Sequence, residues 1–232
     1  MILENAKDFI MSIKISQDVN YIASKKINCD DILMRVNKAI FNYCSSFGMY
    51  IDVIEKNLSK ISKDKVKSFQ TKCKELYDNQ LEYRFFAKLR NYIVHYDMPF
   101  DSHEINFENS RVICHKQHLL KFKGWKTVKY DIEKMDDEID IVGMLKEMNK
   151  NLAIILLEFQ ALISDNIVNA YETVVKFMKK YNLTNEFSVI RDYSTEKKSR
   201  DENLTITCIN LRELLQLMEE LKHNPLVKIK EK

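Results

Sequence analysis

The fold is decided by the longest helical pattern in the chain, which reads IVGMLKEMNKNLAIILLEFQALISDNIVNAYETVVKF from residue 141 to 177. Its apolar side chains recur every three or four residues, which is the spacing of a helix that buries one face. We expect this helix to open in the acidic run at 131–140 and to end near Tyr181. A helix of this length needs long partners, and antiparallel packing on earlier helices is the natural solution.

Three earlier stretches supply those partners. Helical patterns cover residues 1–26, then a stretch from after Asn28 to about residue 54, and then a stretch from Asp64 to about His95. Asp64 can cap the third helix, and Pro99 lies just beyond its end. The whole chain holds three glycines and two prolines, which disfavours turn-rich sandwiches and barrels. The predicted fold is mainly α, an antiparallel helical bundle.

Two regions depart from the helical pattern. Short strands with a turn at Gly124 are predicted at 111–115, 119–122 and 126–130. Near the C-terminus, residues 186–190 and 204–209 are expected to pair as strands before a last short helix at 211–222. We expect one domain over 1–232, with these parts: a helical core at about 1–100 and 137–182, a hairpin insertion at about 105–131, and C-terminal strands and helix at about 183–232.

Composition places the chain among ordinary globular proteins. It has 232 residues, of which 45% are hydrophobic and 31% charged, and its formal net charge is only +3. Five widely spaced cysteines without a C-x-x-C pair indicate reduced thiols rather than a disulfide framework. Acids near the N-terminus argue against a secretory signal, and no uninterrupted apolar run approaches the roughly 20 residues that cross a bilayer. The sequence therefore predicts a cytoplasmic protein with no membrane partner.

A polar cluster ends the third helical pattern, in the stretch Arg90-Asn91-Tyr92-Ile93-Val94-His95. Helical spacing puts Arg84, Lys88, Asn91 and His95 on one stripe. The solvent-exposed face of an ordinary helix has the same pattern. Arg90 lies about 140° around the axis from His95. These two side chains can meet only if the helix loosens before Pro99, or if two chains bring them together across a symmetric interface.

The spacing R-N-x-x-x-H resembles the R-x4-6-H motif of the HEPN superfamily, which includes metal-independent ribonucleases of toxin and phage-defence systems. The resemblance covers mainly residues 81–99. It implies that Arg90 and His95 are the catalytic pair, followed at the Arg by a polar residue, here Asn91. From their positions on the stripe or next to the motif, we expect Arg84, Lys88, Tyr96 and Asp97 to support them. The resemblance also implies an RNA substrate, a homodimer, no cofactor and no metal, with an antitoxin or other defence protein as a further candidate partner.

One departure from the family bears on regulation. Some HEPN toxins extend the motif to R-x4-H-x-Y, and their tyrosine is modified by the antitoxin. Here Tyr96 comes one residue early and Asp97 holds the expected place. This argues against control by tyrosine modification and leaves the Arg–His pair intact. Not every family member cleaves RNA, so the resemblance alone does not establish activity.

The chemistry of such a pair fits RNA cleavage. The reaction needs a proton removed from the ribose 2′-OH, charge stabilised on the phosphorane, and a proton delivered to the leaving 5′-oxygen. An imidazole can move the protons, and two of them brought together by a dimer could act as base and acid. Arg90 can hold the phosphate through two parallel hydrogen bonds.

A basic stretch between residues 108 and 131 offers a second indication of RNA. It carries no acid, and the predicted RNA-binding residues in it are Lys116, Lys121, Lys123, Trp125, Lys126 and Lys129. Lysines that contact phosphates and aromatic rings that stack on bases are what single-stranded RNA recognition uses. The alternative is that the acidic run at 131–140 neutralises these lysines.

A zinc site is the last candidate. Cys114, His115 and His118 are close in sequence and His103 lies upstream, but alternate residues of a strand point to opposite faces. We therefore expect no metal. The leading hypothesis is a metal-independent endoribonuclease that works as a dimer, and the alternative is a non-catalytic helical module that binds a partner protein, RNA or a nucleotide.

Overall fold

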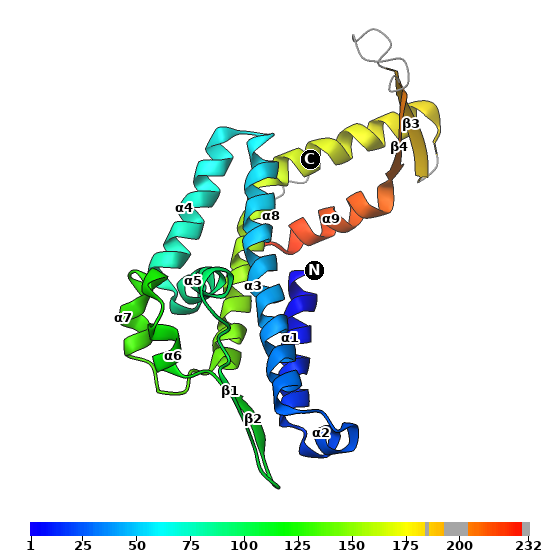
Figure 1. Cartoon of the computed structure of the whole chain (residues 1–232). Helices are drawn as coiled ribbons and strands as arrows, with labels where there is room; N and C mark the ends of the chain where they lie inside the picture. Colours follow the sequence, from blue (N-terminus) through cyan, green and yellow to red (C-terminus); the bar gives the residue numbers. More distant parts are fainter. Residues whose placement is uncertain (184–185, 193–203, 229–232) are drawn as a thin grey trace. The chain divides into compact units, whose positions relative to one another are not determined.

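The structure is a computed structural model that describes the backbone of residues 1–183, 186–192 and 204–228, and the side chains of residues 1–183 and 211–228. The chain divides into two compact units, Met1–Ile155 and Leu156–Lys232, which are described separately. Helices dominate both units, and Figure 1 gives their order. The mainly α fold class is thus confirmed, whereas a single domain over the whole chain stays a prediction.

The first unit is built around α3 (Cys29–Ser59), with α1 (Ile2–Gln17) lying along it (Figure 1). The expected single helix over residues 1–26 is broken, because α2 (Val19–Lys25) starts anew after Asp18. The Asp18 carboxylate accepts a hydrogen bond from the backbone N–H of Tyr21 at 2.9 Å and so caps α2. Asn28 caps α3 in the same way, accepting from Asp31 N at 2.7 Å.

The expected helix from Asp64 to His95 is also two helices, α4 (Lys63–Asn79) and α5 (Leu81–His95). Gln80 between them has an extended backbone, with φ −117° and ψ 113°. Ser62, and not Asp64, is the N-cap of α4, because its hydroxyl accepts from the backbone N–H of Asp64 at 3.2 Å. The break lets α4 and α5 both pack against α3. No proline or glycine marks it, since packing rather than local propensity selects this point.

The core of the first unit is rich in aromatic rings from α3 and α5. Tyr43 meets Phe86 edge to face with ring centroids 5.5 Å apart, and Phe47 meets Tyr83 in the same way at 5.4 Å. The long helix α8 (Ile141–Tyr181) begins in this unit, where its residues Leu145, Met148, Leu152 and Ile155 are buried. Asp140 caps α8, its carboxylate accepting from Gly143 N at 2.8 Å, so the acidic run precedes the helix instead of opening it.

A small hairpin is present, but it is not where the sequence placed most of its strands. Strands β1 (Ser102–Ile105) and β2 (Ser110–Ile113) pair antiparallel, with Ser102 opposite Ile113. The strands predicted at 119–122 and 126–130 are wrong. This region forms α6 (Lys116–Leu120), the short 3-10 helix η1 (Lys123–Trp125) and α7 (Val128–Glu133).

The reason for the correction lies in the buried side chains of this region. Leu119, Trp125, Val128 and Ile132 are all fully buried, and Trp125, Val128 and Ile132 follow one another at intervals of three and four residues, as in helical packing. The indole N–H of Trp125 donates to the Leu119 carbonyl at 2.6 Å, which closes the turn between α6 and η1. A strand would have put Trp125 and Val128, which are three residues apart, on opposite faces.

The second unit holds the rest of α8 together with β3 (Glu186–Asp192), β4 (Leu204–Asn210) and α9 (Leu211–His223). The two strands pair antiparallel with Glu186 opposite Asn210, which confirms the predicted strand pair and final helix. Within this unit α9 buries Leu211 and Leu221, and the Asn224 side-chain amide donates to the Leu157 carbonyl at 2.8 Å.

The length and composition of α8 are relevant to where the protein is located in the cell. Among the described residues it is the one helix that by length and composition could cross a membrane, and 17% of its most apolar stretch is buried. Core helices of soluble proteins meet the same criteria, so one such helix is weak evidence for a membrane segment. The cytoplasmic location stays a prediction.

Candidate functional site

Arg90 of α5 is exposed and lies across α3 at Gly48. A Cβ atom built on Gly48 would stand only 3.1 Å from Arg90 Nε and 3.2 Å from its Cδ. Burial raises the pKa of the Cys44 thiol, one turn earlier on α3, and the positive charge of Arg90 lowers that pKa by a smaller amount. No ion pair involves Arg90 among the residues that the structure describes. Its guanidinium therefore lies against α3 with no carboxylate partner in the described part of the chain.

His95 is the last residue of α5 and is exposed. Tyr96 follows as the C-cap, and its N–H still donates to the Tyr92 carbonyl at 2.8 Å. The helix thus keeps its geometry to His95 and does not loosen before Pro99. Arg90 and His95 consequently leave α5 about 140° apart. Within residues 1–183 and 211–228, no hydrogen bond or ion pair involves the His95 ring.

The supporting residues on α5 have mixed surroundings. Arg84 is engaged within the chain: its guanidinium makes a two-point contact with Asp131 of α7, at 2.7 and 3.0 Å, and both side chains are 20% exposed. Lys88 and Asn91 are half-buried. Tyr96 is 48% exposed, and its ring lies against Tyr92, with centroids 5.5 Å apart. It is the supporting residue best placed to border a bound base.

The basic stretch is only partly available to RNA. Trp125 is entirely buried, stacked on Phe85 at 5.8 Å and on Tyr92 at 5.4 Å, so it packs the core and does not stack on a base as predicted. Lys116 is likewise engaged, with Asp137 at 3.0 Å and the Met135 carbonyl at 2.8 Å. The remaining predicted contacts are exposed; they are Lys121, Lys123, Lys126 and Lys129, the last of which lies 3.6 Å from Glu133.

Two carboxylates of the loop after α5, Asp97 and Asp101, meet two imidazoles at the start of α6, a cluster that sequence analysis missed. The His115 ring donates from Nδ1 to Asp101 Oδ1 at 2.6 Å, and the His115 backbone N–H donates to Asp101 Oδ2 at 3.2 Å. His118 Nε2 lies 3.1 Å from the Met98 carbonyl and 3.5 Å from Asp97 Oδ2. Both histidines were noticed as zinc candidates, but their carboxylate partners lie 14 and 21 residues away and no sequence signal connects them.

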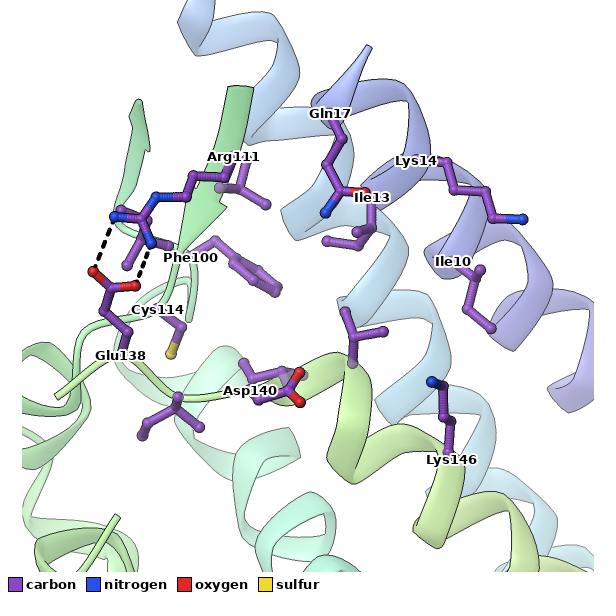
Figure 2. A pocket seen from close by; sticks show the side chains of 15 residues that line it. Ile10, Ile13, Lys14, Gln17, Phe100, Arg111, Cys114, Glu138, Asp140 and Lys146 are labelled. Carbon is purple, nitrogen blue, oxygen red and sulfur yellow. Dashed lines mark hydrogen bonds and ion pairs between the residues drawn. The ribbon is translucent and has the colours of Figure 1, made fainter. Parts of the chain in front are cut away.

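A groove of about 530 Å³ opens elsewhere in the first unit, between α1, β2 and the start of α8 (Figure 2). Apolar side chains of α1 and β2, among them Ile10, Ile13 and Ile113, form part of its lining. Figure 2 shows Arg111 bound to Glu138, while Asp140 is engaged in capping α8. Of the residues singled out in the sequence, the zinc candidate Cys114 lines this groove, and none of the predicted catalytic, supporting or RNA-binding residues does.

Metal ligands do not gather in the described part of the chain, where no group of three or more His, Cys, Asp or Glu side chains is placed to hold an ion. Each zinc candidate has a different partner or environment. His103 bonds to the Ser110 hydroxyl at 2.8 Å, Cys114 is buried, and His115 and His118 face carboxylates. The four cysteines whose side chains are described are free thiols.

Comparisons with known proteins provide no relative. No model of a protein family, no curated protein and no solved structure matches the chain. The resemblance to HEPN proteins therefore rests on residues 81–99, and function has to be argued from the arrangement of side chains at the end of α5.

Proposed function

We propose that this protein is a metal-independent endoribonuclease of a toxin or phage-defence system, with Arg90 and His95 as its catalytic pair. The observation that carries the proposal is that a guanidinium and an imidazole near the end of one helix are both exposed, with no carboxylate partner among the described residues. The nearby Arg84, by contrast, is bound to Asp131. Arg90 and His95 are therefore available to a ligand in a way that Arg84 is not.

Each group has a defined task in this reaction. Arg90 binds the scissile phosphate through two N–H donors and stabilises the charge that develops on its oxygens. His95 is the last residue of α5 and its side chain is exposed. It is suited to deliver a proton to the 5′-oxygen as that oxygen leaves. Attack by the 2′-oxygen yields a 2′,3′-cyclic phosphate.

A dimer would complete the site. Because Arg90 and His95 diverge around α5, two chains related by a twofold axis can place the guanidinium of one beside the imidazole of the other. Several apolar side chains around this end of α5 are exposed, as a self-complementary interface requires; they are Met34, Phe41, Val94 and Met98. A pocket of about 410 Å³ opens among three of them, Met34, Phe41 and Met98.

Incubation with RNA in EDTA tests the proposal. We expect the wild-type protein to cleave, and R90A and H95A to lose most of the activity while keeping their circular dichroism spectrum. The matched control is H223A, which removes an exposed histidine on α9 and should cleave like the wild type. A requirement for Mg²⁺, or activity that survives both substitutions, contradicts the proposal.

A second candidate function rests on another observation. Lys121, Lys123 and Lys126 are exposed close together in the sequence, which suits RNA binding without cleavage. In that case the RNA stays intact, its affinity falls steeply with salt, and replacing the three lysines by glutamine reduces the salt slope. This is the non-catalytic module, and it would use the same helical fold in the cytoplasm.

A further inference from the structure

We infer that His115, positioned by Asp101, is a second proton-transferring residue of the same site and acts as the general base on the 2′-OH. The inference rests on the proposed ribonuclease function and deepens it. It starts from the shortest contact of the missed cluster, the 2.6 Å hydrogen bond from His115 Nδ1 to Asp101 Oδ1.

Asp101 fixes the His115 ring in one tautomer. A carboxylate accepts hydrogen bonds, so His115 Nδ1 carries the proton and Nε2 of the neutral ring carries the lone pair. Asp101 is itself held in place, since its second oxygen accepts the backbone N–H of His115 and its side chain is only 15% exposed. The His115 ring is 44% exposed. An oriented imidazole with an unprotonated nitrogen and access to solvent is what a general base needs.

Contacts join this pair to the end of α5. Asp101 Oδ2 lies 4.0 Å from His118 Nδ1, and the opposite edge of the His118 ring reaches Asp97, two residues after His95. The Tyr92 ring packs edge to face against His118, which anchors the loop to the buried face of α5. His95 immediately precedes the loop at residues 96–101, and His115 contacts the last residue of the same loop, Asp101.

The different surroundings of the two histidines assign the role of general base to His115 and the role of general acid to His95. When His115 Nε2 takes the 2′-OH proton, the imidazolium is stabilised by Asp101, as in a carboxylate–histidine pair. His95 has no carboxylate partner among the described residues, and we assign it the acid role. The 2′-oxygen forms its bond to phosphorus, the bond from phosphorus to the 5′-oxygen breaks, and His95 gives its proton to that oxygen. One proton is taken and one is returned, so no metal or cosubstrate is consumed.

A substrate with a sulfur leaving group separates the two roles. We compare RNA with a dinucleotide whose bridging 5′-oxygen is replaced by sulfur, which leaves without protonation. On RNA, H115Q and H95Q should each lose on the order of 10²- to 10⁴-fold in kcat. On the sulfur substrate H95Q should regain nearly wild-type activity and H115Q should not. Glutamine at 115 keeps an N–H donor for Asp101, so the loop retains its anchor.

Two further measurements exclude a merely structural role. Free imidazole should restore cleavage by H115A, and D101N should lower kcat with little change in KM. H223Q is the matched histidine control. Wild-type rates for H115Q on both substrates, with H95Q inactive on RNA, overturn this inference and leave the proposed function standing. If the wild-type protein cleaves neither substrate, the proposed function is wrong, and so is the role of His115 as its general base.

Discussion

Gly48 is the residue whose position is hardest to explain by stability alone. It lies in the interior of a 31-residue helix, where glycine costs about 1 kcal/mol relative to alanine. The close approach of the Arg90 side chain supplies a reason, since a Cβ at this position would stand 3.1 Å from Nε. We interpret Gly48 as the residue that lets Arg90 lie flat on α3.

Substituting Gly48 should therefore move stability and activity in opposite directions. G48A should raise the free energy of unfolding by up to about 1 kcal/mol in urea titrations, because the flexible Arg90 chain can shift by a few tenths of an ångström. The displaced guanidinium should lower RNA cleavage on the order of tenfold. The double variant G48A/R90A should cleave no less than R90A. Equal cleavage by G48A and wild type would refute this role.

His103 predicts a pH dependence of stability. Burial lowers its pKa from the ordinary value of 6.5. The Ser110 hydroxyl donates to the Ser16 carbonyl, so His103 Nε2 donates to Ser110, and among described residues its buried Nδ1 has no partner. The unfolded chain then binds more protons, and the stability contributed by the neutral ring is complete above pH 6.5 and is lost as pH falls below it. Urea titrations at pH 7.5 and 5.5 should show a smaller difference for H103Q; an unchanged difference contradicts this.

At the scale of elements, the contact of α5 with α7 depends on Arg84 and Asp131. Their two-point ion pair is mostly shielded from solvent, so R84Q should lower the free energy of unfolding by about 1–2 kcal/mol. The matched control is E133Q, which removes the exposed pair with Lys129 and should cost less than about 0.5 kcal/mol. If R84Q instead abolishes cleavage at unchanged stability, Arg84 contacts RNA after all.

Trp125 ties η1 to α5 and belongs to the same scale. W125A should cost about 3–5 kcal/mol, because it empties a fully buried site between two aromatic rings. W125F keeps an aromatic ring there and should retain wild-type affinity for single-stranded RNA in fluorescence anisotropy. A selective loss of RNA binding by folded W125F would restore the tryptophan as a base-stacking residue.

The whole molecule decides where the catalytic groups come from. If Arg90 of one chain works with His95 of another, the mass in solution by light scattering should be twice 27.6 kDa. Co-expressed R90A and H95A chains should then recover activity, because a mixed dimer contains one site with both groups intact. If the protein is a monomer, or if the mixed dimers are inactive, a site shared between two chains is excluded. RNA cleavage would then take place within one chain or not at all.

Long periodic segments were predictable from local sequence. The helices at 29–59 and 141–181, the strand pair 186–192 with 204–210, and the last helix at 211–223 follow the apolar spacing of their own residues. The breaks between helices could not be predicted from local sequence. Asp18 and Gln80 break helices without proline or glycine, and α6 and α7 replace predicted strands, because packing against α3 and α5 outweighed weak local preferences.

The same division holds for the candidate site. The sequence by itself determined the helical architecture and the presence of Arg90 and His95 near one helix end, because both depend on spacing along a single element. Only the tertiary structure showed that Arg84 pairs with Asp131, that Trp125 is buried, that Arg90 lies against Gly48, and that Asp101 bonds to His115. Those relations join residues from separate elements, and only the packing of those elements sets the distances between them.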